Sequence, residues 1–324
     1  MISESFPMQA KPSDSRVASL RKMAWACAAL VLAITTLSAF IRLSTVGLGC
    51  EPWPQCYSEA WRAAAEELSP APAAGVAAAR TAHRLLAVAS LLLIIAMMMS
   101  AYAKQPVLRR EGRMVLGLLA LALFLAILGR FTAGTRVPAV TLGNLLGGFA
   151  LFALSCRLAT TLGREPAAAS GIGALVHWAR FGAALLVLQI LLGGLLSAGH
   201  AGLSCPYLPG CETAAGSWQL LNPWHVAPID QNDPTHPAGS LLHAVHRAGM
   251  WVVAAVLLPL GFACWRSGRR AGAWLLALLA LQAALGAGLI LGGLPLTLAL
   301  AHNIGAALLL AVLLALASPQ VSRG

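Results

Sequence analysis

Long apolar runs, separated by short polar segments, recur along the whole of this 324-residue chain. Eight of them reach the length of about 20 residues that an α-helix needs to cross the hydrocarbon core of a bilayer. None shows the strict alternation of apolar and polar residues that marks the strands of a transmembrane barrel. The runs predict eight transmembrane helices, at Met23–Leu43, Val76–Tyr102, Met114–Ala133, Pro138–Cys156, Leu175–Gly199, Gly239–Trp265, Ala273–Leu291 and Leu296–Ala317.

The composition agrees with a multi-pass membrane protein. Hydrophobic residues make up 59% of the chain and charged residues 10%, whereas soluble domains carry roughly 45–50% and about 25%. This balance excludes a soluble globular enzyme and also a disordered or fibrous protein. The formal net charge of +11 is compatible with nucleic-acid binding only if the basic residues gather on one accessible surface.

The 22 Lys and Arg residues are distributed unevenly between the two sides of the predicted bundle. With a cytoplasmic N-terminus, 14 lie on the cytoplasmic side, two (Arg62 and Arg136) lie on the other side, and six lie inside predicted helices. The positive-inside rule therefore predicts that both termini are cytoplasmic. The basic segments then face an anionic lipid leaflet, so the charge requires no nucleic acid. The first helix follows a polar tail and lacks a small-residue cleavage site behind it, which predicts a retained helix.

A four-helix unit occurs twice in the chain. Long loops follow the first and fifth predicted helices, and each loop contains two cysteines separated by five residues. The second helix of each unit carries a His-Arg pair. These repeated features are Cys50 and Cys56 with His83-Arg84, then Cys205 and Cys211 with His246-Arg247. Leu-Gly and Pro also recur, as they do in any membrane protein, but the paired Cys and His-Arg motifs are hard to obtain by chance.

The repeat predicts an all-α membrane protein of eight transmembrane helices, arranged as two four-helix bundles. Because each half has an even number of helices, a pseudo-twofold axis along the membrane normal should relate the halves. The predicted divisions are a cytoplasmic tail (1–22), an N-terminal half (23–158), a cytoplasmic linker (159–174), a C-terminal half (175–317) and a tail (318–324).

Three histidines are predicted at a similar depth in the membrane. His83, His246 and His302 each lie roughly 9–10 Å below the outer surface at 1.5 Å per residue. A single histidine often only hydrogen-bonds to a neighbouring helix, but a matched set favours ligation of a metal. Zinc is disfavoured because no Asp or Glu lies in a predicted helix. Two neutral imidazoles that face each other across an apolar bundle suit a haem, and His246 and His302 form such a pair.

Two arginines directly follow histidines of this set. Arg84 and Arg247 can reach past the ring of the preceding histidine toward the outer surface. We expect them to pair with haem propionates, which would compensate their charge. The alternative is that they snorkel to lipid headgroups.

The four loop cysteines lie on the predicted outer, oxidising side. Disulfides Cys50–Cys56 and Cys205–Cys211 that hold each loop are the favoured interpretation. A second interpretation is that the cysteines exchange disulfides with a partner thiol, and a third is that they bind zinc.

Together these residues resemble the heme A synthase family of cytochrome oxidase assembly, over nearly the whole chain from Arg42 to Ala307. The resemblance implies a b-type haem between His246 and His302 in the C-terminal half. It implies a substrate site in the N-terminal half, where a methyl group of heme O is oxidised to the formyl group of heme A, with His83 and Arg84 holding the substrate. The motifs that carry it are FIRLSTVGLGCEPWPQCY (40–57), TAHRLLA (81–87), PAVTLGNLLGG (138–148), GLSCPYLPGC (202–211), HAVHRAG (243–249) and LAHNIGAALLL (300–310).

Two positions depart from the pattern of that family. The family carries Glu three residues before the histidine of its second helix, where this chain has Arg80, and a His on its fourth helix, where this chain has Asn144. Arginine cannot accept a proton at working pH, and asparagine is a poor haem ligand. The alternative function is therefore a catalytically impaired family member that binds b-type haem, transfers electrons or assists oxidase assembly. A haem-free small-molecule transporter is a third hypothesis.

The resemblance also implies a location and partners. The location is the bacterial inner membrane, with the Cys loops on the periplasmic side. The implied partners are heme O and the enzyme that makes it, the cytochrome oxidase assembly machinery and membrane lipid, with a homo-oligomer as a further option.

Overall fold

The computed structural model describes residues 14–44, 71–132, 137–162, 173–208, 210–226 and 237–317. Within these ranges the chain contains helices and no strand, and eight helices are long and apolar enough to cross a membrane. Each coincides with a predicted apolar run, so these eight predictions are confirmed. The helices are α1 (Asp14–Ser44), α3 (Ala71–Tyr102), α4 (Arg109–Thr132), α5 (Pro138–Thr161), α6 (Ala174–Ala198), α7 (Ser240–Arg266), α8 (Arg270–Leu291) and α9 (Leu296–Leu316).

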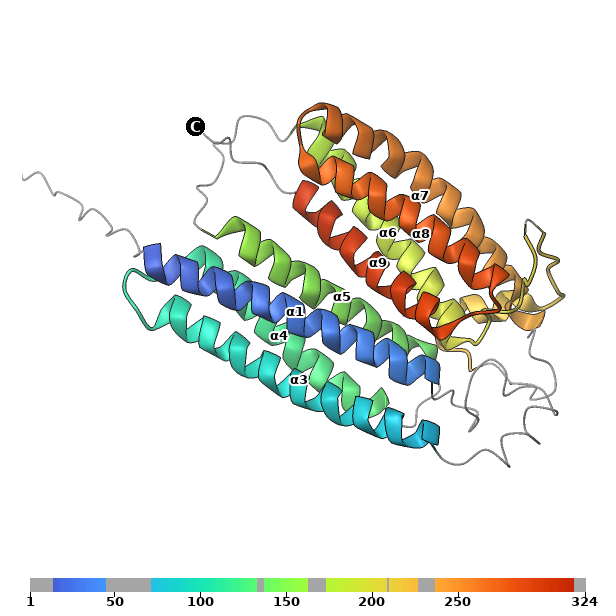
Figure 1. Ribbon diagram of the computed structural model, residues 1–324, viewed down its shortest axis with the longest axis horizontal. Helices are drawn as coiled ribbons and strands as arrows, with labels where there is room; N and C mark the ends of the chain where they lie inside the picture. Colours follow the sequence, from blue (N-terminus) through green and yellow to red (C-terminus); the bar gives the residue numbers. More distant parts are fainter. Residues whose placement is uncertain are drawn as a thin grey trace, which may run out of the picture.

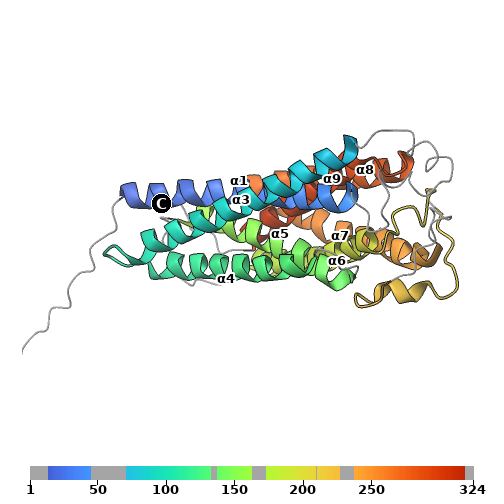
Figure 2. The same cartoon turned by 90° about the horizontal axis from the view of Figure 1, so that it is seen from below.

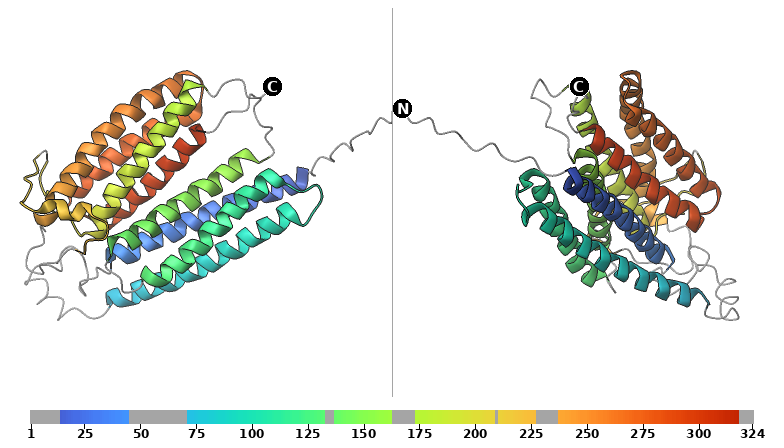
Figure 3. Two further views of the ribbon diagram at one scale, coloured as in Figure 1. Left: turned by 180° about the vertical axis from the view of Figure 1, so that it is seen from behind. Right: turned by 60° about the vertical axis from the view of Figure 1, so that its left-hand side comes forward.

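The helices lie in two neighbouring groups of four (Figure 1). Helices α1, α3, α4 and α5 form one group and helices α6 to α9 form the other. Between the groups, α5 packs against α6 and α9, and α1 packs against α9. The views from below and from behind show that all eight helices run along the long axis of the bundle (Figures 2 and 3).

The two ends of the bundle differ in what they carry. Helix α1 starts and helix α9 ends at the same end, while the segment between α6 and α7 lies at the opposite end (Figures 1 and 3). We call this opposite end the loop end. It contains the short 3-10 helices η2 (Ser217–Leu221) and η3 (Pro237–Gly239). Which end faces the cytoplasm stays a prediction from the charge distribution.

Two basic residues of α1 cap the ends of other helices. Arg16 donates hydrogen bonds to the carbonyl oxygens of Ser100 and Pro106, both at 2.8 Å, next to the end of α3. Arg21 donates to the carbonyl oxygen of Leu162 at 2.5 Å, just after α5. Basic side chains are favourable there because the last carbonyls of a helix lack helical partners and carry partial negative charge. Part of the basic excess therefore ties α1 to its neighbours instead of facing lipid.

The starts of α5 and α9 follow the proline signals in the sequence. Pro138 is the first residue of α5, and Pro295 immediately precedes α9. Proline is well tolerated there because the first N–H groups of a helix have no helical acceptor. Gly293 and Leu294, with φ of 66° and 61°, form the tight turn that leads from α8 into α9.

One buried apolar cluster extends through both groups of helices, and a smaller one lies at the loop end. The large cluster includes Phe149 of α5, Leu257 of α7 and Leu309 of α9. In the small cluster, Leu220 of η2 packs against α5, α6 and α7; its members are Leu142, Leu195, Ala201, Leu220 and Leu242. The segment after α6 is therefore docked across both groups of helices.

Candidate functional site

His246 lies six residues after the start of α7, at the loop end of the bundle, and its side chain is half-buried. Gln189 of α6 donates a hydrogen bond from Nε2 to the backbone carbonyl oxygen of His246 at 2.8 Å. The same Nε2 lies 3.2 Å from the ring nitrogen Nδ1. One turn further along α6, Gly193 leaves room for the ring, because a Cβ at this position would come within 3.0 Å of ring atom Cε1. Two residues of α6 thus fix the position of this ring.

His302 occupies a matching place on α9. It lies six residues after the start of its helix and is half-buried. Gly286 of α8 faces its ring, with room for an added Cβ at 3.6 Å from ring atom Cε1. Ring nitrogen Nδ1 of His302 is buried and has no hydrogen-bond partner. Helices α7 and α9 both begin at the loop end and belong to the same group of four helices. The structure therefore places the two histidines that the sequence selects near the same end of one four-helix group.

The two rings fit the requirements of a haem held by two histidines. They come from different helices, and a glycine of the neighbouring helix lies against each. An orphaned ring nitrogen at His302 matches the second hydrogen-bonding position that an iron-ligating histidine uses for orientation. Within the part of the chain that the structure describes, no three His, Cys, Asp or Glu side chains gather into a site for a metal ion. A haem needs only two side-chain ligands.

A third histidine lies beside this pair. His243, one turn before His246 on α7, is 4% exposed and hydrogen-bonds to the backbone of Ala201. Its Nδ1 is buried without a partner. His243 is not among the histidines selected from the sequence as ligands, although its spacing of three residues from His246 puts both on one face of the helix.

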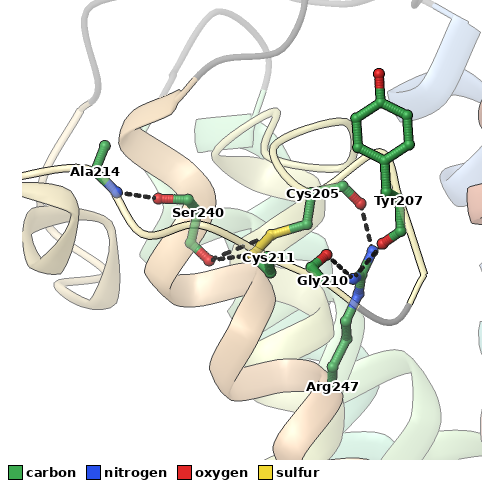
Figure 4. Close-up of a disulfide and its surroundings, with 7 residues drawn as sticks. All are labelled: Cys205, Tyr207, Gly210, Cys211, Ala214, Ser240 and Arg247. Atoms are coloured by element: carbon green, nitrogen blue, oxygen red, sulfur yellow. Dashed lines mark hydrogen bonds between the residues drawn. A yellow bond between two sulfur atoms is a disulfide. The ribbon is translucent and has the colours of Figure 1, made fainter.

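Arg247 holds the loop that precedes α7. Its Nη1 donates hydrogen bonds to the carbonyl oxygens of Tyr207 at 2.9 Å and Gly210 at 3.2 Å, and its Nη2 donates to that of Cys205 (Figure 4). Its Nε is buried and has no partner. These contacts differ from the haem propionate expected from the sequence, and that role stays a prediction.

The loop that Arg247 holds is closed by a disulfide between Cys205 and Cys211, with a Cα–Cα distance of 5.0 Å. This pairing confirms one of the two predicted disulfides, whereas Cys50 and Cys56 lie outside the described residues. The two sulfur atoms lie 3.6 and 3.5 Å from the carbonyl oxygen of Ser240, the first residue of α7. The hydroxyl of Ser240 accepts a hydrogen bond from the Ala214 N–H at 2.8 Å (Figure 4). The disulfide therefore packs directly on the start of the helix that carries His246.

The predicted site residues of the N-terminal half lie on α3 and α5. His83 is half-buried on α3, and Arg80 and Arg84 are exposed. Helix α3 begins at Ala71, so His83 lies twelve residues from the start of its helix, compared with six for the other two histidines. Distance from the start of a helix does not measure depth in the membrane, so the equal depth of the three histidines stays a prediction. Asn144 is half-buried on α5.

Comparison with known proteins gives a match over most of the chain. The COX15-CtaA family model, described as cytochrome oxidase assembly protein, matches residues 21–314. A heme A synthase from Shewanella oneidensis is 32% identical over 305 residues, which cover 87% of this chain and 91% of that protein. These matches confirm the resemblance that the sequence motifs indicate. The chain belongs to the COX15-CtaA family of cytochrome oxidase assembly proteins.

Proposed function

We propose that the protein is a membrane-embedded heme A synthase, which oxidises a methyl group of heme O to the formyl group of heme A. Family membership over most of the chain supports the reaction. The observation that carries the proposal is the pair of half-buried histidines, His246 and His302, on two helices of the C-terminal half.

In the C-terminal half, His246 and His302 would hold the iron of a b-type haem. When bound, that haem supplies one-electron transfer. Gly193 and Gly286 leave the space in which the two rings lie. Arg247 uses Nη1 and Nη2 to hold the loop, so its unpaired Nε–H is the group that remains for a propionate.

We place the heme O substrate in the N-terminal half. His83 is the proposed ligand of the substrate iron, and Arg84 is the proposed partner of a propionate. The two side chains point in different directions, because successive residues are rotated by about 100° around a helix. This matches their different exposure, with His83 half-buried and Arg84 exposed.

We also propose that a pseudo-twofold axis relates the halves, with both termini in the cytoplasm and both Cys loops in the periplasm. The excess of basic residues at one side, 14 against two, supports this orientation. The start of α1 and the end of α9 at one end of the bundle are compatible with it (Figure 1). Heme O, the enzyme that makes it and the cytochrome oxidase assembly machinery are the proposed partners.

Co-expression with a heme O source tests the reaction. Haems extracted from the membranes and separated by chromatography should include heme A, and an empty vector gives the background. Purified protein should also show the sharp reduced-minus-oxidised spectrum of a low-spin b-type haem. An unchanged spectrum in both His246→Ala and His302→Ala would contradict the ligand assignment.

A second candidate function is a family member that binds haem without completing the reaction. Arg80 stands where the family resemblance leads us to expect Glu, and Asn144 stands where it leads us to expect His. The N-terminal site then lacks a carboxylate that can act as acid or base. Bound b-type haem without any heme A in the co-expression experiment would favour this function over the synthase.

A further inference from the structure

The glutamine on α6 and the histidine on α7 form a repeated contact. Gln189 lies four residues before Gly193, and both contact His246. The amide oxygen Oε1 of Gln189 lies against Gly249, three residues after His246 on α7, where any side chain would collide with it. Helices α6 and α7 therefore interlock through a Gln-x3-Gly segment on one helix and a His-x2-Gly segment on the other.

Helices α8 and α9 repeat this contact with different residues. Gln282 lies four residues before Gly286 on α8, and Gly286 faces His302. Oε1 of Gln282 lies against Gly305, three residues after His302. Here two polar atoms are left over, because Oε1 of Gln282 and Nδ1 of His302 are both buried without a hydrogen-bond partner. One atom is an acceptor, and the other is a donor when the ring carries its proton on Nδ1.

The pair α4 and α5 provides an internal comparison. Asn144 on α5 is followed three residues later by Gly147, and Leu125 of α4 lies against Gly147, with its Cδ2 2.5 Å from the position of an added Cβ. This pair of helices therefore has the same contact between a side chain and a glycine. The histidine and the glutamine are both replaced in it, by Asn144 and Leu125. The glutamine is thus found beside both proposed ligands of the C-terminal haem and is absent beside Asn144.

We propose that Gln189 and Gln282 are positioning residues that orient the two haem-ligating histidines, an inference that rests on the proposed haem between His246 and His302. A neutral imidazole that binds iron through Nε2 carries its proton on Nδ1 and needs an acceptor for it. The amide oxygen of each glutamine is that acceptor. Oε1 of Gln282 and Nδ1 of His302 are already unpaired. Gly305, which Oε1 of Gln282 contacts, lies one helical turn after His302 on α9.

Gln189 must change its arrangement to fill the same role. Its Nε2 now lies toward Nδ1 of His246, which matches a ring with its proton on Nε2. Turning the amide gives up the hydrogen bond from Nε2 to the backbone carbonyl oxygen of His246 and brings Oε1 to Nδ1. The proton of the neutral ring moves from Nε2 to Nδ1, so that the ring carries one proton before and after. Gly249 makes this turn feasible because it has no Cβ to block the amide.

The test compares acceptors and non-acceptors of nearly equal size in the purified full-length protein. Each glutamine is changed singly to Met, which cannot accept this hydrogen bond strongly, and to Glu, which accepts it more strongly than an amide. The measurements are the haem content per chain, the midpoint potential of the bound haem and its low-temperature electron paramagnetic resonance spectrum. Leu125→Met, at the matching position of α4, is the control and should leave all three unchanged.

A stronger acceptor makes the ligand more basic and stabilises ferric iron. The midpoint potential should therefore rise in Gln189→Met and Gln282→Met and fall in the corresponding Glu variants, with the spectrum shifting in opposite directions. Haem lost from a Met variant but retained in the Glu variant at the same position also supports the proposal. Unchanged potentials, shifts of the same sign in Met and Glu, or haem loss from both would overturn it. A wild-type protein without b-type haem, or haem that survives His246→Ala together with His302→Ala, would instead overturn the proposed function.

Discussion

Replacing Arg247 by Met should release the disulfide loop from α7 while leaving the helix intact. Methionine keeps an unbranched apolar side chain but has no N–H group, so the hydrogen bonds to the carbonyl oxygens of Tyr207, Gly210 and Cys205 are lost. The first two acceptors are exposed, and we assign about 1 kcal/mol to each; the partly buried bond to Cys205 contributes about 2 kcal/mol. Side-chain entropy offsets part of this, which leaves roughly 2–4 kcal/mol for holding the loop.

This free energy translates into how often the loop opens. At about 1.4 kcal/mol per factor of ten, the open population should rise roughly 30-fold to several-hundred-fold. Cys205 is 1% exposed and Cys211 is half-buried, so a reductant reaches the disulfide mainly when the loop is open. With fast opening and closing, the rate of reduction should follow the open population.

The assay is the rate at which a water-soluble phosphine reduces Cys205–Cys211 in the folded protein in detergent. Maleimide labelling followed by peptide mass spectrometry separates these cysteines from the others. Arg247→Lys keeps the charge but not the fork of donors, so its rate should be intermediate. Arg266→Met, the same change at the opposite end of α7, should leave the rate unchanged. If Arg247→Met is reduced at the wild-type rate but loses haem, Arg247 acts on a propionate and contributes little to the loop.

Three further predictions follow from close contacts and from the altered site. Gly193→Ala should shift the haem spectrum because its Cβ would lie 3.0 Å from the His246 ring. Gly286→Ala should leave the spectrum unchanged because its Cβ would lie 3.6 Å from the His302 ring. Equal effects of the two changes would contradict this contact geometry. The double change Arg80→Glu and Asn144→His should raise heme A production by at least roughly tenfold, since a general acid or base contributes 10²–10⁴-fold; a high yield from the unmodified protein would show that the Glu is dispensable. Arg16→Met should lower the free energy of unfolding by about 2–4 kcal/mol, because the carbonyls at the end of α3 lose charged donors, and an unchanged thermal unfolding midpoint in detergent would refute this.

The transmembrane helices could be predicted from the sequence because a bilayer restricts the alternatives. A chain in hydrocarbon must satisfy its backbone hydrogen bonds internally, so an apolar run of sufficient length becomes a helix. The starts of α5 at Pro138 and of α9 after Pro295 could also be predicted, because proline suits the first turn of a helix. Hydropathy does not mark the polar start of α1 at Asp14, nor the short Ala-, Pro- and Gly-containing start of α3 at Ala71, because neither stretch is as apolar as the run that follows it.

Contacts of long polar side chains could not be predicted in the same way. Arg247 bonds to carbonyl groups 37 to 42 residues earlier in the chain, and Arg16 bonds to carbonyl groups 84 to 90 residues later. A guanidinium can donate hydrogen bonds to a carbonyl, a propionate or a lipid phosphate. The residue type alone therefore does not identify the partner. Only the folded position of the loop determines which acceptor is near.

The two proposed haem ligands are therefore fixed to different degrees by the fold. His246 lies on a stretch of α7 that is held at Ser240 by the disulfide loop, at His243 by the Ala201 backbone and at Arg247 by the same loop. Its own ring and carbonyl contact Gln189 of α6. His302 lies on a helix whose neighbouring turn is tight, and its Nδ1 is unpaired. The docked loop thus fixes the backbone around His246 more firmly than the backbone around His302 is fixed. At the rings the order is reversed, because the amide of Gln189 must turn to present its oxygen, whereas the oxygen of Gln282 is already unpaired.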